Sequence, residues 1–525
     1  MGAAPTATDG RSAGFTRAML TVCAMSATVM QALDTTIANV ALPYMQGSLG
    51  ASQDQINWVL TSYIVAAAVL TSPIGWISDR IGRKKLFIIC VAGFTFASLL
   101  CGIAQSIEQM VLFRLLQGSF GAALVPLSQT VMLDIYPPEQ RGTAMSIWGI
   151  GVMLGPIMGP ILGGWLTDNY SWHWVFLVNL PVGIVTLAGL VMFMTDAPPL
   201  AKLRFDWLGF LALSIGIGSL QLMLDRGEQL DWFQSNEVIA EAIISCAGFY
   251  VFFAHTFTTQ NPFVDFAMFR NRNYAGAVAF MFVVGVILYS TLALSTPFIQ
   301  GVMGYPIVAA GMLLATRGVG TLVGMIAVGR LMKILEARTL IFIGTGLIAF
   351  SLHAMIGFTE QTSAQTVTVM GMVQGFGLGL VFVPLSTVAF ITLPDHLRTS
   401  GTAMLTLMRN IGSSIGISVV TAMLISKSAM FHSQLAEKIT PFNDALKMPD
   451  VAAHLDIGSP AGLAVLNDVV TQQASIMAYA NDYKMLFCVC VAMMPLVFLL
   501  GSTRKTAGPQ AQAVHALDQS VIVSD

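Results

Sequence analysis

Long apolar runs separated by short polar segments dominate the chain. An α-helix needs about 20 mainly apolar residues to cross the hydrocarbon core of a bilayer. The runs predict about fourteen such helices, at 18–42, 55–77, 86–105, 110–133, 144–166, 174–194, 208–224, 237–256, 274–296, 307–328, 339–358, 366–392, 400–425 and 483–501. Helices are expected because an open-ended segment in lipid must satisfy its own backbone hydrogen bonds. The seventh and eighth runs are the shortest and the least sharply bounded.

Basic residues lie mainly in the loops of one side. With both termini in the cytoplasm, the outer Lys and Arg residues are few, three more lie within spans, and the rest face inward. The outer residues are Arg226, Lys427, Lys438, Lys447 and Lys484, and those within spans are Arg114, Arg317 and Arg409. Cytoplasmic loops carry an excess of Lys and Arg, so this bias predicts an even number of spans and two cytoplasmic termini.

An internal repeat divides the chain. Gln117-Gly118, followed by Val125-Pro126-Leu127-Ser128, recurs as Gln374-Gly375 followed by Val383-Pro384-Leu385-Ser386, and a second pair of motifs has nearly the same offset. The repeat predicts an all-α, polytopic fold of two homologous six-helix bundles around a midplane site. The expected parts are a tail at 1–17, bundles at 18–194 and 261–501, an inserted helix pair at 195–260 and a tail at 502–525. The second bundle includes a long polar external loop at 427–482, in which some helix is expected.

Composition agrees with a membrane protein. Charged residues make up 10% of the chain and hydrophobic residues 55%, whereas soluble domains have about 25% charged residues. The net charge of −2 gives no reason to expect nucleic-acid binding. The sequence contains no HExxH or Walker motif, which disfavours an intramembrane enzyme. No appended soluble domain is visible, which disfavours a sensor.

Asp34 is the first candidate functional residue, because an ionisable group within a span is expensive and is by default a functional hypothesis. Gln31 and Thr35 share its helix face, and Asn39 is a further cavity candidate. One reading is that Asp34 exchanges a proton or couples to substrate. The other is a permanently charged acid in a buried ion pair.

Arg114, in the fourth span, is the expected partner of Asp34. The two spans run in opposite directions, and a rise of about 1.5 Å per residue places both groups on the outer side of the midplane. Gln117 lies on the face of Arg114. The alternative is that Arg114 only satisfies backbone carbonyls between helices.

The second half is expected to differ chemically from the first. Arg317 and Arg409 lie within its spans, but we find no intramembrane acid that matches Asp34. Gln374 repeats Gln117 and is a cavity candidate together with the two arginines. Proton handling is therefore expected in the first half.

The segment from Gly75 to Lys85 joins the second and third spans on the inner side. Its glycines allow a tight turn and close helix approach, and Asp79 can interact with a helix N-terminus or an arginine. A basic anchor alone is the simpler reading, but the combination favours an inner gate. Its residues are Gly75, Asp79, Arg80, Gly82, Arg83 and Lys84.

The fifth span carries small residues and prolines at short spacing: Gly151, Gly155, Pro156, Gly159, Pro160, Gly163 and Gly164. Small residues four apart allow close helix packing in lipid, and proline bends helices. Packing alone, and a seal against leakage between gating elements, are both compatible with the pattern.

Together these motifs resemble the major facilitator superfamily, and within it the fourteen-span drug:proton antiporters of the EmrB/QacA type. The resemblance covers about residues 15–505. It is carried by 33–43, 75–85, 112–118 and 151–164, with further matches at 171–183 and 205–209. The resemblance implies proton coupling through Asp34 and Arg114, an inner gate at 75–84 and export rather than uptake.

The resemblance also implies a setting and partners. The expected protein is a proton-coupled multidrug exporter of the bacterial inner membrane, with the proton as coupling ion and no cofactor or metal. Related exporters of Gram-negative bacteria work with a periplasmic adaptor and an outer-membrane channel. His173 stands where arginine is common, and the extra intramembrane acids of some dicationic-drug exporters have no counterpart. Lipophilic weak acids, neutral compounds or monocations therefore fit as substrates, and a dedicated exporter of one metabolite, lipid or siderophore is the alternative.

Overall fold

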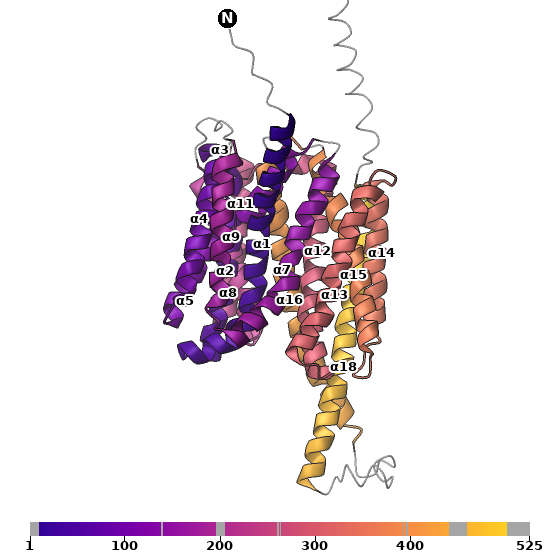
Figure 1. Cartoon of the computed structure of the whole chain (residues 1–525). Helices are drawn as coiled ribbons and strands as arrows, with labels where there is room; N and C mark the ends of the chain where they lie inside the picture. Colours follow the sequence, from indigo (N-terminus) through magenta and orange to yellow (C-terminus); the bar gives the residue numbers. More distant parts are fainter. Residues whose placement is uncertain are drawn as a thin grey trace, which may run out of the picture.

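A computed structural model describes residues 10–137, 140–195, 205–259, 262, 264–391, 393–394, 397–439 and 459–500. The described part is helical (Figure 1). Its first helices are α1 (Gly10–Leu49), α2 (Gln53–Thr71), α3 (Ile74–Ile81), α4 (Arg83–Cys101), α5 (Ile107–Gly121), α6 (Leu124–Ile135), α7 (Arg141–Asn169), α8 (Trp174–Leu177) and α9 (Asn179–Phe193). The later helices are α10 (Trp207–Arg226), α11 (Asn236–Thr258), α12 (Arg272–Pro297), α13 (Ile307–Leu331), α14 (Ala337–Met355), α15 (Ala364–Ile391), α16 (Arg398–Ala436) and α18 (Pro460–Met493).

The predicted number of spans is confirmed. In the described residues, 13 helical segments are long and apolar enough to cross a membrane, and the bent pair α2–α3 brings the number to 14. The bend of 58° lies between Thr71 and Ile74, where Pro73 lacks the backbone N–H that would continue the helix.

Two helical bundles stand side by side, with α1–α9 in one and α12–α18 in the other (Figure 1). In the first, α1 packs on α7 and α9, and α5 packs on α2 and α4. In the second, α15 packs on α13 and α14, and α16 packs on α12 and α18. The bundles meet through α7 and α13 and through α16 with α2, α3 and α6. This is the predicted pseudo-symmetric arrangement, while its limits at 18–194 and 261–501 stay a prediction.

The inserted pair α10–α11 lies against both bundles. The two helices pack on each other, and α10 also contacts α2 of the first bundle and α16 of the second. Ser414 of α16 donates a hydrogen bond to Gln221 Oε1 of α10 at 2.7 Å. Thr61 of α2 donates one to Asp225 of α10. The insertion therefore bridges the two bundles on one side.

The segment 427–482, predicted as an external loop with some helix of its own, is helical at both of its ends. Helix α16 continues to Ala436 and α18 begins at Pro460, and both protrude beyond the other helices (Figure 1). The 39 residues of α16 correspond to about 58 Å of helix, roughly twice the thickness of a hydrocarbon core. Residues 440–458 of this segment, the tails at 1–9 and 501–525, and Lys202 and Arg204 lie outside the described residues.

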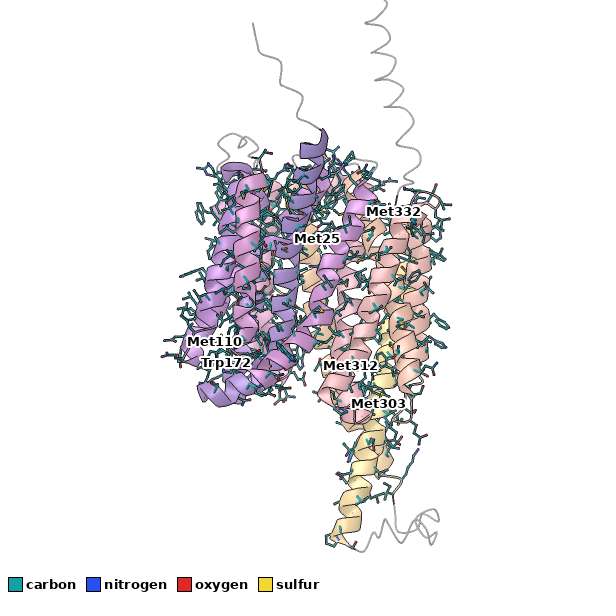
Figure 2. All side chains as sticks on the ribbon, in the orientation of Figure 1. Met25, Met110, Trp172, Met303, Met312 and Met332 are labelled. Carbon is teal, nitrogen blue, oxygen red and sulfur yellow. The ribbon has the colours of Figure 1, made fainter. Side chains whose placement is uncertain are left out.

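Two ends of the molecule can be distinguished. We call the end where α1 begins the near end, and the end where α16 and α18 protrude the far end (Figure 1). Thr130 and Thr402 share a hydrogen bond of 3.0 Å across the two bundles. A Cβ atom at Gly75 would lie 2.9 Å from Ser400 Cα. Met332, near the same end in Figure 2, has its Sδ 3.3 Å from a Cβ position at Gly142. The bundles are thus in close contact at the near end.

Candidate functional site

An ion pair between Asp34 and Arg114 lies inside the first bundle. Arg114 Nη1 on α5 is 2.6 Å from Asp34 Oδ2 on α1, and both side chains are almost completely buried, with exposures of 1% and 0%. This is the contact predicted from the opposite directions of the two spans. A buried pair of this kind is stable only when the remaining lone pairs and N–H groups find partners.

Neutral side chains complete the hydrogen bonding of Asp34. Gln117 Nε2 donates to Asp34 Oδ1 at 2.8 Å, and Asn179 Nδ2 donates to the same oxygen at 3.3 Å. The same two amide groups donate to Ser98 Oγ at 3.1 and 3.0 Å. Helices α1, α4, α5 and α9 therefore meet in one polar network surrounded by apolar side chains.

Arg114 also has partners besides Asp34. Its Nε donates to the Val59 carbonyl oxygen at 3.0 Å, and its Nη1 also donates to Gln117 Oε1 at 2.8 Å. The guanidinium lies over the Tyr63 ring, with 4.2 Å between its carbon and the ring centroid. Cation–π contact adds to the stabilisation when the site is desolvated. Arg114 thus contacts both the carboxylate of Asp34 and one backbone carbonyl, so the reading that it only satisfies backbone carbonyls is wrong.

The pair of Asp34 and Arg114 places one negative and one positive charge in a buried part of the bundle. A proton placed on Asp34 would remove the charge that Arg114 neutralises. The guanidinium would keep its contacts with the Val59 carbonyl, with Gln117 and with the rings of Tyr63 and Phe176, the second at 5.6 Å. Electrostatic interactions are strongest in such a low-dielectric interior. A change in the protonation of Asp34 is therefore able to alter the side-chain contact that joins α1 to α5.

The other candidates on α1 contribute less directly. Gln31 Nε2 is 3.5 Å from the Tyr63 hydroxyl, Thr35 bonds to the Ala32 carbonyl of its own helix at 2.8 Å, and Asn39 is exposed. The sequence analysis did not single out Ser98, Tyr63 or Asn179. Asn179 lies in the segment 171–183 that carries part of the family resemblance, and that signal could have identified it.

The glycines of α7 face α1 beside this network. Cβ atoms at Gly155 and Gly159 would overlap Ala32 and Thr36, and Thr36 Oγ1 donates to the Gly155 carbonyl at 3.0 Å. Gly163 faces Ile37, whereas Gly164 has no neighbour within 4 Å. The side chains of Pro156 and Pro160 are not among those described. The stripe therefore holds α1 close to α7 next to Asp34, and of its glycines Gly164 takes no part in the contact.

A charge cluster at the near end joins the two bundles. Asp134 of α6 forms ion pairs with Arg83 of α4 and with Arg398 of α16, the second with 3.1 Å between Nη1 and Oδ1. Arg80 lies over the Trp76 ring at 5.5 Å. Asp134 and Arg398 were not among the sequence candidates, because each is an ordinary charged residue in a loop-flanking position and only the fold places them together.

The predicted turn and close approach are present in the 75–85 segment. Gly82 has φ of 89°, a left-handed conformation that favours glycine, and it lets α3 end one residue before α4 begins. Gly75 lies against Ser400 of the other bundle. Asp79 lies in the last turn of α3, and Lys84 is partly exposed in the first turn of α4.

The second bundle holds polar groups that lack partners. Arg317 and Gln374 line one small cavity with mainly apolar neighbours, whereas Arg409 is buried on α16 at the close contact with Gly285 of α12. Helix α12, the counterpart of α1 in the repeat, contains no Asp or Glu, so no acid of this half matches Asp34 in position. A buried acid is present on another helix. Asp482 of α18 is fully buried, and neither of its carboxyl oxygens has a hydrogen-bond partner. Asp482 was missed because the predicted span began at residue 483, whereas α18 begins 23 residues earlier, at Pro460, and includes Asp482.

Comparisons with known proteins point to one family. The family model of the Major Facilitator Superfamily matches residues 24–417. The chain is 35% identical over 427 residues to "Multidrug export protein EmrB" of Haemophilus influenzae, covering 81% of this chain and 84% of the relative. It is 34% identical over 493 residues to "Fatty acid resistance protein FarB" of Neisseria gonorrhoeae, covering 93% and 96%.

Solved structures show the same fold at low sequence identity. The proton:xylose symporter XylE superposes with a TM-score of 0.61 at 13% identity, covering 93% of this chain and 97% of that one. The human organic anion transporter MFSD10 superposes with a TM-score of 0.58 at 12% identity, covering 91% and 99%.

Proposed function

The chain belongs to the major facilitator superfamily, and we propose that it exports small amphipathic or lipophilic compounds in exchange for protons. The observation that carries this proposal is the buried network of Asp34, Arg114 and Gln117. A carboxyl group with these partners can hold or release one proton inside the membrane. The names of its relatives, a multidrug export protein and a fatty acid resistance protein, support export as the direction of transport.

The coupling step follows from the geometry of the pair. When Asp34 is deprotonated, Arg114, Gln117 and Asn179 fix α1 against α5 and α9. A proton entering from outside neutralises Asp34, weakens its hold on Arg114 and frees α1 to move. Release of that proton to the cytoplasm restores the pair. Substrate leaves in the opposite direction because the two bundles expose their common cavity to one side at a time.

We assign the near end to the cytoplasm and the far end to the outside. The near end carries Arg17, Arg80, Arg83, Lys84 and Arg398, as the distribution of basic residues requires for inner loops. Both termini are then cytoplasmic. Because the bundles touch at the near end, through Thr130 with Thr402 and Gly75 with Ser400, the structure corresponds to a state closed toward the cytoplasm.

The near-end charge cluster then acts as the inner gate, which gives a first prediction. Replacing Asp134 with asparagine removes both of its ion pairs. Only the pair with Arg398 crosses between the bundles, and Asp134 is partly exposed, so this pair is worth about 0.2–1 kcal/mol. We therefore expect the ratio of inward-open to inward-closed molecules to rise by a factor of about 1.4 to 5. Spin labels at Lys85 and Arg330, both exposed near-end residues, would report the distance distribution.

Glu237→Gln is the matched control for this change, because Glu237 pairs with Arg226 at the far end and its loss should leave the near-end distances unchanged. If Asp134→Asn gives the distance distribution of the unmodified protein, the gating role of Asp134 is wrong.

The setting follows from the family. We propose a bacterial inner-membrane location, and a periplasmic adaptor and outer-membrane channel as partners, which would meet the far end where α16 and α18 protrude. A pull-down of the intact complex from detergent-solubilised membranes, using the tagged full chain, tests the partners.

The general proposal is tested in proteoliposomes with an imposed pH gradient. The panel contains fluorescent monocations, neutral dyes and weak-acid uncouplers. Gradient-driven flux of several unrelated compounds would support polyspecific export. Flux of a single class of metabolite, lipid or siderophore would favour a dedicated exporter on the same fold, and no flux of any compound with or without the partner proteins would overturn proton-coupled export.

A further inference from the structure

The coupling step proposed above leaves one buried acid of the second bundle without a role. Asp482 of α18 is 0% exposed, and within the described residues neither of its carboxyl oxygens has a hydrogen-bond or ion-pair partner. Asp34, by contrast, has an arginine and two amide groups around it. A buried carboxylate without such partners is so costly that the group takes up a proton instead. Asp482 therefore holds a proton in this state of the protein.

The helices around Asp482 supply no counter-ion to it. Helix α18 packs on α12, α14 and α16. Beyond the near-end first turn of each, the charged or titratable residues of these three helices are Tyr289, His353, Arg409, Lys427 and His432. On α18 itself, Tyr479 and Tyr483 lie close enough to interact electrostatically with Asp482. Lys484 is exposed, and Arg317 of α13 interacts with Tyr483. None of these groups bonds to the carboxyl oxygens of Asp482.

The face of α18 that carries Asp482 also contacts α12. Tyr479, Asp482 and Tyr483 are three and four residues apart and therefore share one side of the helix. The hydroxyl oxygens of Tyr483 and Ser295 are 3.4 Å apart. The Tyr479 ring lies edge-on to the Phe298 ring, with 5.1 Å between the ring centroids. Asp482 is thus flanked by the two tyrosines that join α18 to the end of α12.

This end of α12 lies at the far end of the molecule. The other end of α12 is at the near end, where the Tyr274 hydroxyl donates to the Gly401 carbonyl oxygen at 2.9 Å. Helix α12 ends at Pro297, and one π-helical turn, Phe298–Val302, follows it. Proline and a π-turn interrupt the regular hydrogen bonds of a helix. The contact with α18 is therefore made where α12 is able to bend.

The same face of α18 indicates the side from which Asp482 exchanges its proton. Toward the near end, the residues one and two turns beyond Asp482 are Leu486 and Cys490, and both are fully buried. Toward the far end, the corresponding residues are Ala478 and Ala474, which are also buried but small, and α18 then protrudes beyond the other helices (Figure 1). The route to water is therefore less obstructed toward the outside.

We propose that Asp482 is a second proton-binding site of this exporter, that it exchanges its proton with the outside, and that the bound proton holds the far end of α12 against α18. The inference rests on the proposed function and adds an outer gate that responds to outside pH. When Asp482 loses its proton, the anion has no partner at this contact, so α18 and the end of α12 separate and water reaches the carboxylate. Uptake of a proton restores the contact.

The direction of the pH dependence follows from this difference. Asp482 holds its proton while the contact is packed and gives it up when the contact separates. Acidic pH therefore favours the packed arrangement, and rising pH favours the separated one. For one proton, the ratio of separated to packed molecules changes by at most about tenfold per pH unit.

Infrared difference spectroscopy measures the proton directly, on the full chain in lipid nanodiscs with isotope-labelled aspartate. Near neutral pH, where exposed aspartates are ionised, we expect Asp34→Asn to show a protonated-aspartate C=O band that the double variant Asp34→Asn with Asp482→Asn lacks. We expect this band to disappear from Asp34→Asn as the pH is raised. Identical spectra of the single and double variants, or a band of Asp482 that persists in alkaline buffer, would overturn the proposal.

Spin labels at Gly301 and Met477 measure the separation of α12 from α18. Both positions are exposed, and a Cβ atom at Gly301 would meet no atom within 4 Å. The exposed Cys246 and Cys488 are replaced with serine to avoid labelling them. We expect the distance between the labels to lengthen as the pH is raised. Asp482→Asn should keep the short distance at every pH, because asparagine stays neutral.

Two further variants complete the comparison. Asp468→Asn is the matched control, because Asp468 is an exposed acid earlier on the same helix, and it should respond to pH as the unmodified protein does. Tyr483→Phe removes the hydroxyl that meets Ser295 and should raise the separated fraction at neutral pH, so it provides the test if Asp482→Asn does not fold. An unchanged pH response in Asp482→Asn, or an unchanged separated fraction in Tyr483→Phe, would overturn the role of this contact.

Proton counting separates exchange with the outside from transport of a second proton. If Asp482 exchanges only with the outside, Asp482→Asn will move as many protons per substrate as the unmodified protein. A smaller number would mean that this proton crosses the membrane, and would overturn the proposed exchange. Failure of the export proposal itself is distinguishable, because it shows as absence of gradient-driven flux, whereas the infrared and spin-label measurements use neither substrate nor gradient.

Discussion

Replacing Asp34 with asparagine is expected to lower pH-gradient-driven export about 100-fold, a change of about 2.7 kcal/mol in the coupled step. Asparagine has nearly the volume of aspartate and can still accept hydrogen bonds from Gln117 and Asn179. Asparagine cannot take up a proton, so the pH gradient cannot drive transport through this position. Flux of the panel compounds into inverted proteoliposomes, with and without the gradient, measures the effect.

Two controls separate coupling from folding. Exchange of labelled for unlabelled substrate needs no net proton movement and should persist in Asp34→Asn. Asp168→Asn removes an exposed far-end carboxylate that accepts a hydrogen bond from Tyr44 at 2.7 Å, and should transport normally. Gradient-driven export that survives in Asp34→Asn would show that this residue has only a structural role.

Loss of Arg114 alone should be the most destabilising single change in the first bundle. Arg114→Leu leaves the Asp34 carboxylate buried without a counter-ion, and breaking a buried pair on one side destabilises by about 3–5 kcal/mol. We expect a large fall in thermal stability at neutral pH. The loss should shrink at acidic pH, because a protonated Asp34 no longer needs the guanidinium. Scanning fluorimetry in detergent over a pH series measures both effects.

The double variant Asp34→Asn with Arg114→Leu tests the origin of this loss. If the unpaired carboxylate is the cause, the double variant will be more stable than Arg114→Leu alone, although it still lacks the contacts to Val59 and Tyr63. Arg226→Leu, which removes an arginine from the far-end surface, is the matched control and should lower stability by less than about 1 kcal/mol. A double variant as unstable as Arg114→Leu would assign the loss to packing rather than charge.

Much of the fold could be predicted because its determinants are local. The length of each apolar run identifies a membrane span, and the positions of Lys and Arg indicate which side of the membrane each loop faces. The break between α2 and α3 and the protrusion of α16 and α18 could not be predicted in the same way. A hydropathy pattern marks where lipid surrounds a helix, but a helix can bend within that zone or continue beyond it into water when its sequence still favours helical structure.

The central pair could be predicted for a similar reason. Charged residues are so rare within spans that Asp34 and Arg114 stood out, and helix rise placed them at one depth. The neutral partners did not stand out, because Ser98 and Asn179 are common residue types that acquire meaning only from the donors and acceptors around them. Asp134 and Arg398 are distant in sequence, and only the contact between bundles makes them a pair.

The sequence by itself therefore determined the membrane setting, the number of spans, the two-fold repeat and the residues whose charge is expensive in lipid. The tertiary structure decided which of those charges are neutralised. Asp34 and Arg114 share a saturated network, whereas Arg317, Gln374 and Asp482 retain unpartnered polar atoms. The physical reason is that the energy of a buried polar group depends on the donors, acceptors and charges within a few ångströms of it, and these come from helices far apart in the chain.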